Sequence, residues 1–175
     1  MPIFARTKLV LRDYCMYPQK DLYLTYEGPN AHLVYPQIIT FIKESFGVTE
    51  RDIQPFTFEW ERGKVEKFKV EWRVNKDIDK FSYFRIRIRM SGEIRPSEKF
   101  GKEGKISMRL RGELLTEYPQ DTWWERSMVY EILRTLWHRI FYRQKRWEYR
   151  EVCKEAMMTF HNRVKEFFNL LPQKV

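Results

Sequence analysis

Hydrophobic and polar residues alternate strictly along four stretches in the middle of the chain. Successive side chains point to opposite faces of a β-strand, so this pattern places one face of each stretch on a core and the other in water. Such alternation is typical of an antiparallel sheet. The apolar positions are Phe56, Phe58 and Trp60; Phe68, Val70, Trp72 and Val74; Phe84, Ile86, Ile88 and Met90; and Ile106, Met108 and Leu110. Between the last two stretches, the charged residues from Arg95 to Gly104 predict a loop.

The N-terminal part predicts two short strands, Thr7 to Tyr14 and Leu22 to Tyr26, and then a helix. Asn30 follows a Gly-Pro pair and is a residue type that caps helices. The helix is expected to end at Gly47, because glycine is the usual stop signal. Its apolar face would consist of Tyr35, Ile38, Ile39, Ile42 and Phe46.

The C-terminal part predicts a long helical segment over residues 122–171. Thr122 and Glu125 have the spacing of a capping box, and no breaker follows before Pro172. One apolar stripe contains Val129, Leu133, Leu136 and Ile140, and a second contains Cys153, Met157, Phe160, Val164, Phe167 and Leu171. The polar residues 143–151 separate the stripes, so we expect a bend or a solvent-exposed stretch there.

These elements indicate one α+β domain over residues 1–175, with an antiparallel β-sheet packed against a long C-terminal helix. Strands and short helices occupy residues 1–118. The order of elements resembles the helix-grip arrangement of the START/polyketide-cyclase superfamily. The resemblance implies that the sheet curls around the last helix and encloses an apolar cavity. Its lining would include Phe68, Trp72, Ile86, Ile88 and Met108.

Composition narrows the class of protein. Of the 175 residues, 17% are aromatic and only 7 are glycine, which argues against disorder. Cys15 and Cys153 are far apart and form no CxxC motif, so we expect free thiols in a reducing compartment and a cytoplasmic location. No run of apolar residues is long enough to span a membrane. The abundance of Lys, Arg and Glu is thermophile-like.

No recognisable catalytic motif is present, and we expect no enzymatic activity, no cofactor and no metal site. The three histidines, His32, His138 and His161, do not have the spacing of metal ligands. Glu59 and Glu61 could form a carboxylate pair, or simply neutralise nearby Lys and Arg side chains.

The net charge of +9 is unevenly distributed, which makes the basic residues the best candidates for function. One predicted strand places arginines on its polar face about 6.8 Å apart, and the next strand can extend the row. The basic part of the helical segment is interleaved with aromatic residues, as suits RNA. The predicted nucleic-acid-binding residues are Arg85, Arg87, Arg89, Arg109, Arg111, Arg139, Arg143, Arg146, Trp147 and Arg150.

Two other interpretations of this charge stay open. Glu59, Glu61, Glu66 or Glu71 could neutralise the strand arginines across the sheet, and the basic helix could be a solvated face. The leading hypothesis is a non-enzymatic basic protein that docks on RNA or on a ribonucleoprotein such as the ribosome. The alternatives are a binder of a small apolar, lipid-like ligand and a homo-oligomeric scaffold held by the C-terminal helix.

Overall fold

The computed structural model describes residues 10–99, 101–117, 122, 127–137, 140 and 142–170. These residues form an α+β structure, and the predicted fold class is confirmed. Three α-helices are present in the described ranges: α1 (Val34–Phe46), α2 (Met128–Trp137) and α3 (Arg143–Leu170). Two short 3-10 turns, η1 (Ala31–Leu33) and η2 (Glu50–Asp52), flank α1. The strands are β1 (Val10–Tyr14), β2 (Asp21–Pro29), β3 (Ile53–Glu61), β4 (Glu66–Asp77), β5 (Ser82–Ser97) and β6 (Gly101–Glu117).

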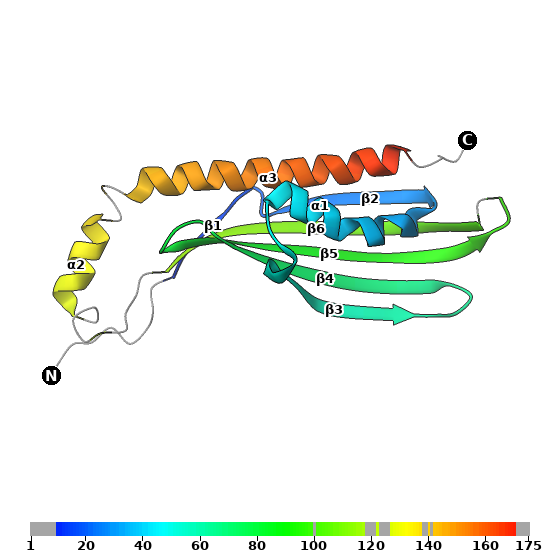
Figure 1. Ribbon diagram of the computed structural model, residues 1–175, viewed down its shortest axis with the longest axis horizontal. Coiled ribbons are helices and arrows are strands. Elements are labelled where there is room, and N and C mark those ends of the chain that lie inside the picture. The colour runs from blue at the N-terminus through cyan, green and yellow to red at the C-terminus, as the bar shows by residue number, and fades with distance from the viewer. Residues whose placement is uncertain are drawn as a thin grey trace.

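The six strands form one antiparallel sheet in the order β1-β6-β5-β4-β3, with β2 also paired to β6 (Figure 1). The last strand therefore lies beside the first two. β6 is long enough to pair with both: its end, Glu113–Glu117, pairs with β1, and Glu103–Arg111 pairs with β2. β1 and β2 together form one edge of the sheet, and the short segment between them interrupts this edge.

Helices α1 and α3 lie against each other on one face of this sheet (Figure 1). The apolar residues predicted to point inward on β4, β5 and β6 are at most 5% exposed. The prediction is wrong for Phe56 and Phe58, which are 58% and 60% exposed on β3, the edge strand of the sheet. From the helix side, Met157, Phe160 and Val164 fill the space above the strands and are fully buried. The strand members of this core include Phe68, Val70, Trp72, Val74, Phe84, Ile86, Ile88, Met90, Ile94, Ile106, Met108, Leu110 and Leu114.

The C-terminal helical segment differs from the prediction of one helix over 122–171. Thr122 lies in a bend, and α2 begins only at Met128. Ser127 caps this helix instead, since its Oγ accepts a hydrogen bond from the Tyr130 backbone N–H at 3.2 Å. A second helix, α3, then runs without a break from Arg143 through the polar stretch, most of which is solvent-exposed as expected. Glu125 and Leu171 lie outside the described residues.

The loop predicted between Arg95 and Gly104 is mostly strand. β5 continues to Ser97 and β6 starts at Gly101, so the two strands extend their ladder beyond the apolar core. Backbone hydrogen bonds hold this extension, and they do not depend on apolar side chains. Gly101 has a positive φ of 74°, a conformation that glycine adopts without strain.

The two cysteines are not free thiols, which corrects the expectation from the sequence. Cys15 and Cys153 form a disulfide across 138 residues, and their side chains are 1% and 0% exposed. The bond joins the segment after β1 to the middle of α3. The fold brings these positions together because Cys15 lies beside Gly112 of β6, where its N–H donates to the Gly112 carbonyl at 3.0 Å. Sequence separation gave no sign of this proximity.

Candidate nucleic-acid interface

The arginines predicted on the strands gather on the face of the sheet opposite α1 and α3. β5 contributes Arg85, Arg87 and Arg89, while its even-numbered neighbours point into the core. In the β5–β6 register, Arg87 lies opposite Arg111 and Arg89 opposite Arg109. The row of arginines therefore does extend from one strand to the next. Like charges placed opposite each other destabilise a sheet unless other groups compensate them.

Asp21 on β2 compensates both β6 arginines. Its carboxylate accepts hydrogen bonds from Arg109 Nη2 at 2.6 Å and from Arg111 Nε at 2.7 Å. The hydrogen bond from Arg111, helped by that from Arg109, outweighs burial and holds the pKa of Asp21 well below its usual value. Asp21 is thus ionised wherever the protein is folded near neutral pH, and it fixes both guanidinium groups against the sheet.

Two further carboxylates neutralise the β5 arginines. Glu71 accepts hydrogen bonds from Arg89 Nε at 2.6 Å and from Arg73 Nε at 3.1 Å. Glu113 is buried, and its Oε2 lies 3.6 Å from Arg87 Nη2. The sequence identified Glu71 as a candidate partner, but Asp21 and Glu113 are found only once the pairing of strands is known. Most of the charge on this face is therefore engaged in internal ion pairs.

Arg85 is the remaining strand arginine, and its Nη2 donates to the Tyr83 hydroxyl at 3.0 Å. The other carboxylates considered from the sequence lie elsewhere. Glu59 is 3.9 Å from Lys69 Nζ, and Glu66 accepts a hydrogen bond from Lys102 Nζ at 2.8 Å. Glu59 is therefore held in a charge pair with a lysine.

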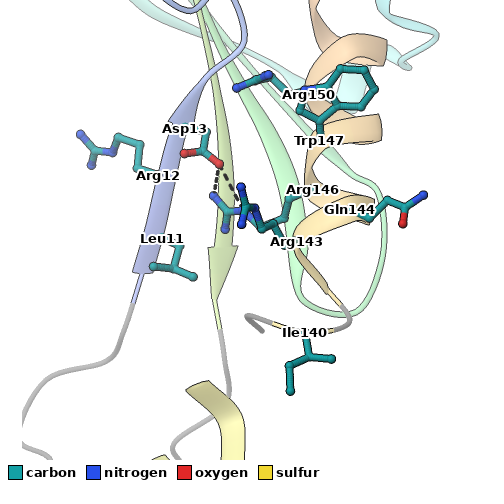
Figure 2. Close-up of a pocket in the computed structure, with 9 residues that line it drawn as sticks. All are labelled: Leu11, Arg12, Asp13, Ile140, Arg143, Gln144, Arg146, Trp147 and Arg150. Carbon is teal, nitrogen blue, oxygen red and sulfur yellow. Dashed lines mark hydrogen bonds and ion pairs between the residues drawn. The ribbon is translucent and has the colours of Figure 1, made fainter. Parts of the chain in front are cut away.

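The helix arginines form a different kind of surface, a groove between the start of α3 and β1 (Figure 2). Arg143, Arg146 and Arg150 occur at i, i+3 and i+7, so they lie on one face of the helix. The cavity has a volume of about 710 Å³. We call it the arginine groove, and its lining residues are Leu11, Arg12, Asp13, Ile140, Arg143, Gln144, Arg146, Trp147 and Arg150.

Arg146 is the fixed centre of the arginine groove. Its side chain is 8% exposed, and its Nε and Nη2 donate to Asp13 of β1 (Figure 2). The third nitrogen, Nη1, is buried and has no hydrogen-bond partner in the described part of the chain. A buried guanidinium N–H without an acceptor is unfavourable, and Arg87 Nε on the sheet is in the same situation among the described residues.

The other two helix arginines are more weakly engaged. Arg143 is exposed and forms no ion pair within the residues that the structure describes. Arg150 Nη2 lies 3.9 Å from Glu151, at the outer limit of an ion pair. Asp13 is the one carboxylate in the groove lining, which also contains four arginines, so the groove keeps a positive excess. Arg12 also lines the groove, but its side chain points away from α3 in Figure 2.

Trp147 gives the groove an aromatic surface. It lies one position after Arg146 on α3, and 58% of its surface is exposed. An indole ring is usually covered when it serves only the core, because it presents a large apolar area. The structure thus brings together four of the predicted binding residues, Arg143, Arg146, Trp147 and Arg150. The five predicted residues on the strands form a separate surface: Arg85, Arg87, Arg89, Arg109 and Arg111. Arg139 lies outside the described residues.

Asp79 anchors the start of α3 to the turn between β4 and β5. It accepts hydrogen bonds from the hydroxyl groups of Tyr142 at 2.6 Å and Tyr149 at 3.1 Å, and from the backbone N–H of Phe81 and Ser82 at 2.8 Å each. Burial alone would raise the pKa of Asp79, but these hydrogen bonds outweigh it and lower the pKa. No local pattern in the sequence predicts this cluster, although it fixes the start of α3 and thereby the position of the groove arginines.

The described residues contain no group of three His, Cys, Asp or Glu side chains that could hold a metal ion. No helix among them has the length and apolar character needed to cross a bilayer. The side chains expected to line a lipid cavity belong to the buried core cluster, and Ile86 and Ile88 are fully buried. No protein-family model matches the sequence, and no related protein is found among curated proteins.

Proposed function

We propose that this protein binds RNA, free or in a ribonucleoprotein particle, through the arginine groove. The observation that carries the proposal is the convergence of Arg143, Arg146 and Arg150 beside the exposed ring of Trp147. Phosphates need positive charge, and unpaired bases need a flat surface on which to stack. A cavity of about 710 Å³ has room for a nucleotide-sized group.

The arginine groove supports this function better than the sheet face does. On the sheet, Asp21, Glu71 and Glu113 occupy most of the guanidinium groups, and a phosphate would have to displace them. In the groove, Arg143 is exposed and has no carboxylate to displace among the described residues. We therefore assign the sheet arginines a mainly structural role and the helix arginines the contact with RNA.

The test is the salt dependence of binding to a fluorescein-labelled single-stranded RNA of mixed sequence, measured by fluorescence anisotropy. Three phosphate contacts predict a logarithmic slope of about −2.1, at about −0.7 per contact. Arg143→Glu is expected to weaken binding and to flatten the slope by about 0.7 or more. Its melting temperature should stay close to that of the wild type, because an exposed charge contributes little to stability.

Lys145→Glu is the matched control, since it makes the same change of charge on an exposed residue of the same turn of α3. Lys145 does not line the groove, so it should have the smaller effect on affinity. Equal losses in the two variants would show that only net charge matters. Absence of binding at low salt, where attraction is strongest, would reject the proposal.

Trp147→Ala separates stacking from charge. If a base stacks on the indole, the variant should lose about 1–3 kcal/mol of affinity while the slope stays the same. The melting temperature should be unaffected, because the side chain is mostly exposed. An unchanged affinity would leave the groove as a site for phosphate without stacking.

We propose that the protein binds RNA without catalysing a reaction. We also propose a cytoplasmic location, because RNA is found inside the cell. The disulfide is compatible with this location in one class of organism, since intracellular proteins of hyperthermophiles are rich in disulfides. The abundance of Lys, Arg and Glu points the same way. We also infer a distant relation to helix-grip proteins, supported by the antiparallel sheet packed against the C-terminal helix.

A further inference from the structure

Helix α2 turns its apolar side away from the molecule. Six large aliphatic side chains on and just after this helix are each 50–65% exposed. Arg134 shows the opposite behaviour: its side chain is 4% exposed and donates to Glu131 at 2.8 Å. The exposed side chains, which we call the α2 stripe, are Met128, Val129, Ile132, Leu133, Leu136 and Ile140.

The spacing within the α2 stripe is that of a helix face built to pack against something. Val129, Ile132, Leu133 and Leu136 occur at i, i+3, i+4 and i+7, as in a helix that covers a core. Yet α2 lies beyond the end of the sheet, away from the layer formed by α1 and α3 (Figure 1). A helix of ten residues is marginally stable alone in water and depends on burying its apolar face. Another molecule is therefore needed to cover the stripe.

We propose that the α2 stripe is a dimer interface and that its occupant is the same stripe of a second copy of this chain. The exposed apolar area of the stripe is close to what a dimer needs. A large aliphatic side chain presents on the order of 100 Å² of apolar surface, so six give roughly 600 Å² per copy. A specific interface takes roughly 800 Å² from each partner, which the residues around the stripe can complete. Single exposed hydrophobic residues need no such explanation, but a contiguous patch of this size does.

The low charge of α2 favours a second copy over a lipid surface. Helices that lie in a membrane interface carry many Lys and Arg residues on their polar side. Helix α2 has a single cation, Arg134, which is buried and paired with Glu131. The helix is thus close to neutral, so two copies meet without repulsion along it. A two-fold axis places the same apolar patch on both sides, which is the simplest closed arrangement.

The experiment is a concentration series by analytical ultracentrifugation and by size-exclusion chromatography with light scattering. The wild type is expected at twice the 21.7 kDa of one chain, and to dissociate on dilution. Leu133→Glu/Leu136→Glu should shift the midpoint of dissociation to a concentration at least about 30-fold higher, as for a hot-spot residue. Glutamate is a good helix former, and both positions are exposed, so the variant should keep its circular dichroism spectrum.

Val152→Glu is the control, because Val152 is an exposed apolar residue of α3 outside the stripe. It should dimerise like the wild type. A wild type that is monomeric at every concentration overturns the proposal, and so does a dimer that the double substitution leaves intact. Binding to a membrane is tested by co-sedimentation with vesicles of phosphatidylcholine and phosphatidylserine in a ratio of about 7:3. A wild type that is monomeric in solution but sediments with these vesicles through Leu133 and Leu136 assigns the stripe to a lipid surface instead.

Discussion

Reduction of the Cys15–Cys153 disulfide tests the most consequential correction to the sequence-based expectation. In the chain-entropy description, a cross-link across 138 residues removes about 17 cal/mol/K from the unfolded state, or about 5 kcal/mol at 25 °C. Measured values for natural disulfides run from about 2 to 5 kcal/mol. We expect a loss of this size on reduction, with a fall in melting temperature of roughly 5–20 °C for a chain of this length.

The measurement is a pair of urea unfolding curves, one of oxidised protein and one of protein unfolded, reduced and refolded in reductant. Reduction must be carried out on the unfolded chain, because both sulfur atoms are buried in the folded protein. The reduced form should also unfold with a steeper dependence on urea, since an unfolded state without the cross-link exposes more surface. Cys15→Ser/Cys153→Ser is the control and should be insensitive to reductant.

Two results would refute this reasoning. One is the detection of two reactive thiols in protein that has been unfolded without reductant, which would mean that the bond does not form. The other is an equal urea midpoint for the oxidised and reduced forms. In that case the bond would form, but the unfolded chain would not gain the expected freedom when it is broken.

Two more perturbations follow from the packing and the charges. Gly112→Ala should destabilise the protein by about 1–3 kcal/mol, because a methyl group at this position would overlap the Met157 side chain of α3. A melting temperature equal to that of the wild type would contradict this expectation. Asp21→Asn should lower stability at pH 7, since the pKa of Asp21 is depressed by its bonds to Arg111 and Arg109. A depressed carboxyl pKa stabilises the folded state above about pH 4, the unfolded value, and this contribution is lost as pH falls further. The difference in unfolding free energy between wild type and Asp21→Asn should therefore be constant from about pH 5 to 7 and shrink below about pH 4. If this difference does not change with pH, the ion pairs of Asp21 are not the cause of the lost stability.

The alternation of residues predicted the sheet and its inner face because a one-residue shift would have placed the arginines in the core. Ile86 and Ile88 are buried as predicted, and Arg89 is exposed. The prediction failed where the backbone alone decides the structure. The ends of β5 and β6 lie beyond the core, so no hydrophobic pattern marks them. The start of α2 was predicted too early in the chain. Thr122 and Ser127 are both residue types that cap helices, and their spacing does not show which of them is the cap.

The candidate interface was only partly predictable for a related reason. Arg143, Arg146 and Arg150 share a helix, so their spacing already places them together. Two of the carboxylates that neutralise arginines are Asp13 on β1 and Asp21 on β2. These carboxylates come close to the arginines only because β1 and β2 pair with β6, the last strand. Contacts between residues some 90 or more positions apart leave no local signal in a single sequence.

The position of β6 between the first two strands and the rest of the sheet also constrains how the chain folds during synthesis. Asp21 bonds to Arg111, 90 residues later, so β1 and β2 have no sheet partner until β6 has been made. At about 5–20 residues per second, a ribosome leaves these strands unpaired for several seconds. The hairpins of β3, β4 and β5 can form first, and the N-terminal edge joins them late. Pairing over so long a separation in sequence is slow, and any chain that stops before β6 exposes strand edges to aggregation.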